Sequence, residues 1–436
     1  MNKFFIQTFG CQMNEHDSEI MAGLLVKNGL QPCNRKEDAG LIVINTCSIR
    51  ENADQRFFGT LGQMKKLKEN SPDLVVAVCG CMMQQEHVVE KLRQSYPWVD
   101  LVFGTHNFYD LPEMLNDVGK QRKMLINVVQ ESDTADEMMP AKRLYPHKAL
   151  VNIMYGCNNF CTYCVVPYTR GREKSRTPEA VVREIESLVN DGVQEVMLLG
   201  QNVNSYAGIS ESGERCTFPN LLARINEIAG LERIRFMTSH PKDFSMELIA
   251  AYGSLDKLCK SVHLPVQSGS DEILRRMNRR YTREQYMKIV GELRGIVPDI
   301  CITTDIIVGF PGETENDFLQ TLDLCRNVGY DSAFTFIYSP RSGTPAAAYD
   351  EQIPYNVAHE RFERLVERIN SDSLAKNRLC VGGIFDIPVD AAEAGECAGR
   401  TDGFKPVNFA GDCKVGEICR VKIIDANTFT LRGEIV

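Results

Sequence analysis

The 436 residues include a single tryptophan, no excess of basic residues and no long hydrophobic run. A helix needs about 18 consecutive apolar residues to span a bilayer, so the sequence predicts no membrane-spanning segment and no membrane partner. The N-terminus becomes polar within its first eight residues, too early for the apolar core of a signal peptide. The net charge of −9 argues mildly against a nucleic-acid partner. We therefore expect a soluble, cytoplasmic protein.

The composition is otherwise that of a globular protein, with 43% hydrophobic and 25% charged residues. This excludes a collagen-like, low-complexity or wholly disordered chain. At about 100–200 residues per domain, the length predicts two to four domains. The 16 cysteines are the unusual feature. Because the cytosol keeps thiols reduced, metal binding or redox chemistry explains them better than disulfides.

Residues 1–130 alternate apolar runs with amphipathic stretches. Continuous apolar strands separated by helices are typical of a mainly parallel sheet covered on both faces. We expect strands over 4–6, 41–44, 74–78 and 101–104, and helices over 16–28 and 84–94. Residues 131–142 include several acidic residues without periodicity and are interpreted as a linker.

Residues 143–371 repeat a strand–helix rhythm six times. Six βα units in one run predict a partial, TIM-like (β/α)6 barrel, whose chemistry belongs at the C-terminal ends of its strands. The expected strands are 151–154, 195–199, 234–237, 261–264, 304–308 and 333–337. Residues 372–436 lose this rhythm and predict a small antiparallel β-barrel. The expected fold class is therefore α/β, with three domains.

Three cysteines, Cys157, Cys161 and Cys164, follow the first barrel strand in a C-x-x-x-C-x-x-C pattern. Three thiolates on a short loop can hold three irons of a cubane iron–sulfur cluster, which takes four cysteines when it is fully ligated. The missing ligand leaves one iron open to a small molecule. A structural zinc site would need a fourth Cys or His nearby, and Asn158 and Asn159 are poor substitutes. The spacing therefore favours a cluster with an open iron.

Three more cysteines, Cys11, Cys47 and Cys81, each follow a predicted strand of the first section. The carboxyl ends of parallel strands lie along one edge of a sheet, where ligand sites collect. Cysteines that are distant in sequence would meet there and would again provide three ligands and a vacancy. Each could instead be a small buried hydrophobe, a frequent fate of cysteine, and Cys79 within a strand is interpreted in that way.

The run from Gly156 to Tyr168, GCNNFCTYCVVPY, resembles the signature of radical S-adenosylmethionine (SAM) enzymes. The whole chain resembles the methylthiotransferases, which combine an N-terminal cluster domain, a radical SAM barrel and a C-terminal TRAM domain. The runs that resemble the MiaB-like tRNA branch of this family are TFGCQMNE from Thr8, PYTRGR from Pro167, TSHP from Thr238 and HLPVQSGS from His263. None of the six presumed ligand cysteines departs from the family pattern.

The resemblance implies an enzyme that binds two [4Fe–4S] clusters and SAM. In the superfamily the open iron binds SAM, and an electron through the cluster cleaves SAM to methionine and a 5′-deoxyadenosyl radical. The family uses two SAM molecules and a sulfur held on the N-terminal cluster. For the MiaB-like branch the substrate is isopentenyladenosine beside the tRNA anticodon, which is methylthiolated at carbon 2. We also expect a flavodoxin- or ferredoxin-type reductant and a monomer, and the sulfur donor stays open.

Polar residues at the ends of the barrel strands are candidate SAM contacts. The superfamily commonly contacts the amino group of SAM after strand two, and strand five resembles the segment that lies against the adenine. Any one of these residues could be an ordinary loop residue, but their common position at strand ends favours a binding site. The candidates are Tyr163, Gly200, Gln201, Asn202, Ser239, Gln267, Ser268, Asp305 and Ile307.

The target base must leave its stack, which a single-stranded anticodon loop makes easier. Residues 142–176 have a net charge of +6 and are interpreted as a phosphate-binding stretch, whereas 271–294 could equally be a solvated face. A run from Gly399 resembles the TRAM signature, although its phenylalanines could also be core residues. The candidate RNA-binding residues are Arg170, Arg172, Arg400, Phe404, Lys405 and Phe409.

Three other interpretations stay open. A sister methylthiotransferase would act on threonylcarbamoyladenosine of tRNA or on a ribosomal-protein aspartate. A non-catalytic RNA-binding protein would use its clusters as structural elements or as a redox sensor. A zinc protein would use the cysteines as structural ligands, and metal analysis separates it from a protein with two cubane clusters.

Overall fold

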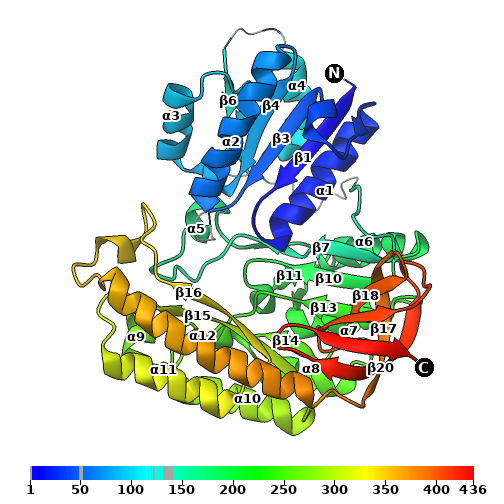
Figure 1. The fold of residues 1–436 in the computed structure, drawn as a ribbon, viewed down its shortest axis with the longest axis vertical. Coiled ribbons are helices and arrows are strands. Elements are labelled where there is room, and N and C mark those ends of the chain that lie inside the picture. The colour runs from blue at the N-terminus through cyan, green and yellow to red at the C-terminus, as the bar shows by residue number, and fades with distance from the viewer. Residues whose placement is uncertain (1, 49–52, 119, 121–122, 131–140) are drawn as a thin grey trace.

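The structure is a computed structural model that describes residues 2–48, 53–118, 120, 123–130 and 141–436. Of the predicted linker 131–142, residues 131–140 lie outside the described residues. Figure 1 shows the N-terminal unit above a larger barrel, with the C-terminal strands against one side of that barrel. The arrangement places the lower edge of the N-terminal sheet over the barrel, so these two units face each other.

The N-terminal unit is a parallel sheet with the strand order β2-β1-β3-β4-β5-β6. Alternate residues of β3 face opposite sides, so that Leu41 and Val43 pack with α1 and α4, whereas Ile42 and Ile44 pack with α2 and α3. This confirms the predicted sheet covered on both faces. The elements are β1 (Lys3–Thr8), α1 (Gln12–Lys27), β2 (Gln31–Pro32), η1 (Lys36–Asp38), β3 (Leu41–Thr46), α2 (Ala53–Asn70), β4 (Val75–Gly80), η2 (Cys81–Gln84), α3 (Glu86–Ser95), β5 (Leu101–Phe103), η3 (Phe108–Asp110), α4 (Leu111–Val118) and β6 (Leu125–Asn127).

The middle unit is a partial barrel of parallel strands in two sheets, β13-β10-β7 and β14-β15-β16. Its first strand begins at Lys148, before the predicted start at residue 151, because the Lys148 ammonium is paired with Asp390 and the position can therefore be polar. The strands are β7 (Lys148–Asn152), β10 (Glu195–Leu199), β13 (Arg233–Phe236), β14 (Ser261–His263), β15 (Cys301–Val308) and β16 (Ser332–Ile337). They confirm the predicted partial (β/α)6 architecture.

Helices of the middle unit begin at sequence-encoded caps. The Thr177 hydroxyl accepts a hydrogen bond from Ala180 N, and Pro178 occupies the first turn, where its missing N–H costs no hydrogen bond. Thr282 and Thr314 form capping boxes. The helices are α5 (Val166–Thr169), α6 (Pro178–Asn190), η4 (Val203–Ser205), α7 (Phe218–Asn226), η5 (Pro241–Asp243), α8 (Met246–Ser254), α9 (Asp271–Arg276), α10 (Arg283–Ile296), α11 (Glu315–Val328), η6 (Pro345–Ala348) and α12 (Tyr355–Arg378). Two hairpins, β8 (Met154–Tyr155) with β9 (Lys174–Ser175) and β11 (Ala207–Ile209) with β12 (Arg215–Thr217), complete it.

The C-terminal unit is a closed barrel with the strand order β17-β18-β19-β21-β20. The pairing of β19 with β21 is parallel and closes the barrel, whereas its other pairings are antiparallel as predicted. The expected boundary at residue 371 lies within α12, which continues to Arg378. The strands are β17 (Ile384–Glu393), β18 (Glu396–Arg400), β19 (Pro406–Ala410), β20 (Ile418–Ala426) and β21 (Leu431–Ile435).

Candidate functional site

Cys11, Cys47 and Cys81 lie at the carboxyl edge of the N-terminal sheet. Cys11 is the N-cap of α1, Cys47 follows β3 and Cys81 begins η2 after β4. The sulfurs of Cys11 and Cys81 lie 4.0 Å and 3.9 Å from the side-chain oxygen of Asn14. Cys47 and Cys81 are buried, whereas Cys11 is half-buried. Asn14 also donates to the carbonyl oxygen of Thr46, the residue before Cys47, so the three segments that carry these cysteines meet at one asparagine. We call Cys11, Cys47 and Cys81 the N-terminal triad.

Two glycines make this close approach possible. Gly10 has φ +121°, and a Cβ at this position would lie 2.5 Å from the Cβ of Cys47. Gly80 has φ +96°, and a Cβ there would lie 2.3 Å from the carbonyl oxygen of Thr46. Both positions need glycine because any side chain would collide with the neighbouring strand end. Cys79 packs inside the core on the α1 face, which confirms its interpretation as a core residue.

Cys157, Cys161 and Cys164 lie in the loop that the β8–β9 hairpin closes, and we call them the barrel triad. Asn278 pins this loop by donating hydrogen bonds to the carbonyl oxygens of Asn159 and Phe160, at 3.1 Å and 3.0 Å. Both Phe160 (φ +48°) and Asn278 (φ +58°) adopt the left-handed conformation. Non-glycine residues in this region store strain and are frequent at functional sites.

Each triad has its own buried arginine, which donates a hydrogen bond to one of the three thiols. Arg170 Nε donates to Cys81 Sγ at 3.2 Å, and Arg279 Nη1 donates to Cys161 Sγ at 3.5 Å. Burial raises the pKa of both Cys81 and Cys164 to about 12. The guanidinium of Arg170 opposes this effect at Cys81, because a positive charge favours the thiolate. Without a bound metal group these buried thiols are therefore protonated, and binding such a group would require them to lose their protons.

The donor sets fit iron–sulfur clusters. Thiolates are the usual ligands of such clusters, and each triad supplies three of them from a mostly buried position. Across the part of the chain that the structure describes, no group of His, Cys, Asp and Glu side chains is arranged to hold a single metal ion. The choice of a cluster over zinc therefore rests on the donor set of three thiols in each triad.

Two candidate SAM residues at the ends of β10 and β13 have buried polar atoms that lack a partner among the described residues. Asn202 donates to Asp243 at 2.8 Å, but its side-chain oxygen is unpaired, and so is the hydroxyl of Ser239. Buried polar atoms without partners are rare in proteins and indicate a place for a ligand. Nearby, Gly200 packs tightly on Met154, and Gln201 contacts the sulfur of Met13 from the N-terminal unit.

The candidates on the other half of the barrel divide into separate environments. Gln267 (φ +67°) joins the strand of Asp305 through backbone hydrogen bonds, and Asp305 lies 3.4 Å from the ring nitrogen of His263. Tyr163 and Ile307 pack together in a small apolar cluster. The hydroxyl of Ser268 instead lies beside Thr321 of α11, at 3.4 Å. Ser268 therefore contributes to helix packing, and the structure does not place it with the other candidates.

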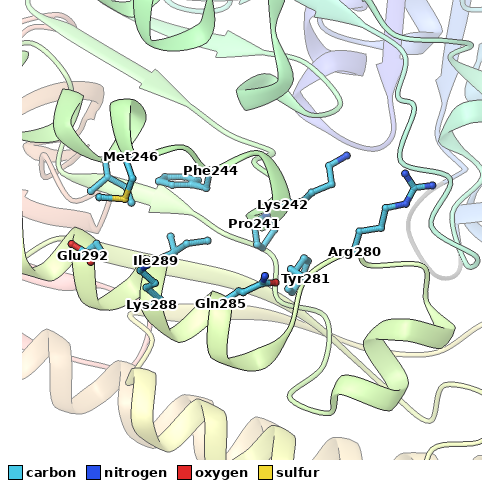
Figure 2. Close-up of a pocket in the computed structure, with 11 residues that line it drawn as sticks. Pro241, Lys242, Phe244, Met246, Arg280, Tyr281, Gln285, Lys288, Ile289 and Glu292 are labelled. Carbon is cyan, nitrogen blue, oxygen red and sulfur yellow. The ribbon is translucent and has the colours of Figure 1, made fainter.

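A lysine that the sequence did not single out connects two strand-end loops. Lys242 Nζ donates to the side-chain oxygen of Asn159 in the loop of the barrel triad, at 2.6 Å. Burial lowers the pKa of the neighbouring His240, which is therefore neutral. Lys242 also lines a pocket of about 290 Å³ between the β13 loop and α10. Figure 2 shows Lys242 and Arg280 extending to one side of this pocket and Met246 and Glu292 at its other end.

Three of the candidate RNA-binding residues make intramolecular contacts. Arg170 is 5% exposed and paired with Asp17, and Phe409 is 1% exposed in the core of the C-terminal barrel. Lys405 forms an ion pair with Asp331 at 2.7 Å, which fixes the C-terminal barrel on the middle unit. Each of these side chains is thus engaged in an intramolecular contact, and its assignment to RNA binding stays a prediction.

The remaining candidates are partly accessible. Arg172 is exposed and lies over the ring of Phe160, 4.4 Å from its centroid. Arg400 lies over the ring of Phe404 at 4.5 Å. Phe404 itself packs with Met13 and residues of β10, where the three units meet. Its position is therefore central in the molecule, near Cys11, and not on the outer surface of the C-terminal barrel.

The basic stretch 142–176 is largely neutralised in the fold. Four of its cations form ion pairs with acids from elsewhere in the chain: Arg143 with Asp191, Lys148 with Asp390, Arg170 with Asp17, and Arg176 with Glu184. Four of the seven cations of this stretch are therefore compensated within the fold, and its interpretation as a phosphate-binding surface stays a prediction. No helix among the described residues has the length and apolar character needed to cross a membrane.

Comparison with known proteins reproduces this three-part organisation. Residues 3–104 match the uncharacterized protein family UPF0004, residues 151–325 match the radical SAM superfamily, and residues 378–436 match the TRAM domain. A protein of Clostridium botulinum (strain Langeland) is 50% identical over 438 residues, covering 100% of this chain and 97% of the relative. One from Clostridium perfringens (strain ATCC 13124) is 51% identical, covering 99% and 97%. Both are named tRNA-2-methylthio-N(6)-dimethylallyladenosine synthase.

The chain belongs to the tRNA-2-methylthio-N(6)-dimethylallyladenosine synthase family. Membership confirms the expected enzyme class, a radical SAM methylthiotransferase, and the family cofactors, two [4Fe–4S] clusters and SAM. Solved structures share the fold. The radical SAM methyltransferase TsrM from Kitasatospora setae, with cobalamin and a [4Fe–4S] cluster bound, has a TM-score of 0.54 at 13% identity, covering 91% of this chain and 77% of TsrM. The cobalamin-dependent radical enzyme OxsB has a TM-score of 0.55 at 14% identity, covering 84% and 61%.

Proposed function

We propose that this chain methylthiolates carbon 2 of N6-dimethylallyladenosine beside the tRNA anticodon. Cys157, Cys161 and Cys164 would hold the radical SAM cluster, and the N-terminal triad would hold the auxiliary cluster. The observation that carries the proposal is the contact between Arg170 of the middle unit and Cys81 of the N-terminal triad, at 3.2 Å. One triad thus lies directly on the unit that carries the other. The full-length relatives named for this reaction support the choice of substrate over that of a sister enzyme.

When bound, the clusters and two SAM molecules would supply the radical, the sulfur and the methyl group. The protein residues would position these groups. Asn202 and Ser239, whose buried polar atoms lack partners among the described residues, would bind SAM at the ends of β10 and β13. Asn278 and Lys242 would hold the loop of the barrel triad in place. Burial between the units would exclude water and oxygen from the reacting atoms.

The substrate would enter as the anticodon stem-loop of tRNA, with Arg172 and Arg400 as candidate phosphate contacts. We propose that the chain is divided into three domains, over residues 1–130, 143–371 and 372–436, with a linker over 131–142. We also propose a cytoplasmic monomer that takes electrons from a flavodoxin- or ferredoxin-type donor.

An anaerobic assay tests the proposed reaction. The reconstituted chain is incubated with SAM, a reductant and tRNA that carries either dimethylallyladenosine or threonylcarbamoyladenosine, and the nucleosides are analysed by mass spectrometry. We expect a methylthio mass gain on dimethylallyladenosine alone. The Cys157→Ala variant serves as the inactive control. A gain on threonylcarbamoyladenosine, or none on either tRNA, would refute the proposed substrate.

A further inference from the structure

Arg170 belongs to the middle unit but makes its side-chain contacts with the N-terminal unit. It is the C-cap of α5, which lies directly beneath the N-terminal sheet in Figure 1. Its guanidinium donates to the side-chain oxygen of Asn14 and to the carboxylate of Asp17, both at 2.7 Å, and to Cys81 Sγ at 3.2 Å. Through Nε and Nη2, a buried side chain of the middle unit therefore binds the N-terminal unit.

The partners of Arg170 connect all three segments that carry the N-terminal triad. Cys81 is itself a member, and Asn14 and Asp17 lie in the first turns of α1, which Cys11 caps. Asn14 also donates to the carbonyl oxygen of Thr46, the residue before Cys47, at 2.7 Å. The Arg170 and Asn14 side chains thus form a hub between the three strand ends.

The charge of Arg170 is balanced by one carboxylate. Both Arg170 and Asp17 have side chains that are 4% exposed, and a buried charge is tolerated only when it is paired and hydrogen-bonded. Hydrogen bonds and positive charge at a ligand sulfur favour the more negatively charged state of an iron–sulfur cluster. Arg170 and Asp17 therefore act on the triad with opposite sign.

We propose that Arg170 is a positioning residue for the auxiliary cluster: it orients the N-terminal triad toward the barrel and raises the reduction potential of the cluster, while Asp17 limits this effect. The inference rests on the proposed assignment of Cys11, Cys47 and Cys81 as cluster ligands. An arginine that served only as an interface ion pair would hold the units together without any effect on the potential.

The test uses the full chain with Cys157, Cys161 and Cys164 changed to Ala, so that only the auxiliary cluster can bind. Arg170→Met, Arg170→Lys and Asp17→Asn are introduced into this background. Arg361→Met is the matched control, because Arg361 is equally buried and paired with Glu313 at 2.8 Å but contacts no thiol in the described structure. Iron content, thermal unfolding and the midpoint potential from a spectroscopic redox titration are measured for each variant.

We expect a shift to more negative potential for Arg170→Met, a smaller shift for Arg170→Lys, which keeps the charge, and a shift to more positive potential for Asp17→Asn. Arg361→Met should lower the unfolding temperature and leave the potential unchanged. Equal potentials in all variants, or shifts of the same sign for Arg170→Met and Asp17→Asn, would overturn the inference. If the background itself binds no cluster, the proposed ligand assignment fails, and the inference fails with it. If Arg170→Met does not fold, the direction of the potential shift in Asp17→Asn still tests the inference, because a shift to more negative potential would contradict it.

Discussion

The N-terminal triad and the barrel triad present the same donors but are built in opposite ways. The barrel triad lies within one loop, closed by a hairpin and pinned by Asn278. The N-terminal triad is gathered from three separate strand ends and depends on the parallel order of β1, β3 and β4. The barrel triad needs only its own loop to be folded, whereas the N-terminal triad forms only when the whole sheet has formed.

The buried arginines beside the two triads also differ, because only one of them is paired with a carboxylate. Arg170 is paired with Asp17, so the charge near Cys81 is compensated. Arg279 instead donates to the carbonyl oxygen of Pro265 at 2.7 Å and to the Tyr281 hydroxyl at 3.1 Å, and it forms no ion pair with any described residue. The barrel triad therefore lies beside an uncompensated buried cation, which should favour a more negatively charged group there than at the N-terminal triad.

The largest effect should come from removing one ligand of each triad in turn. Cys11→Ala and Cys157→Ala should each reduce the iron content from about eight to about four per chain, because the two sites fill independently. Only Cys157→Ala should abolish reductive SAM cleavage. Iron analysis and quantification of 5′-deoxyadenosine give the two readouts, with Cys33→Ser as the control. Unchanged iron in Cys11→Ala would break the assignment of the N-terminal triad.

A smaller effect should follow from Gly10→Ala, which tests the distributed construction of the N-terminal triad. The new Cβ would collide with Cys47, and the left-handed backbone would be strained, so we expect a destabilisation of about 1–3 kcal/mol. Iron at this triad should be lost, while SAM cleavage persists. Gly59→Ala in α2, where a Cβ meets nothing within 4 Å, should instead stabilise by up to about 1 kcal/mol. Denaturant unfolding of the metal-free chain measures both changes, and equal effects would contradict the proposed role of Gly10.

The smallest effect on iron binding should come from Asn278, which supports the barrel triad without being a ligand. Asn278→Ala loses two hydrogen bonds and must place an alanine at φ +58°, so we expect a cost of about 2–3 kcal/mol and slower SAM cleavage. Asn278→Gly loses the same hydrogen bonds but accepts the backbone conformation, so its cost should be lower. Iron at the N-terminal triad should stay unchanged in both variants. If that iron is lost as well, the two triads are not independent.

Local patterns were sufficient for much of the fold and for the donors of both triads. The C-x-x-x-C-x-x-C spacing needed no tertiary information, and Cys11, Cys47 and Cys81 could be grouped because parallel strands end at one edge. The partners of basic residues could not be found in this way. Arg170 and Lys405 were expected to contact RNA, but each is neutralised by an acid more than 70 positions away in sequence. A net charge counted along the chain cannot detect such partners.

The sequence by itself determined the three-part organisation and the strand ends that carry thiols, because hydrophobic periodicity and residue spacing are local properties. Only the tertiary structure decided which cations stay accessible, which polar atoms remain unpaired at the barrel mouth and which arginine faces which thiol. Those properties depend on burial and on partners that are distant in sequence. Burial makes the free-energy cost of an unpaired charge or hydroxyl large, so the partners determine which arrangement is stable.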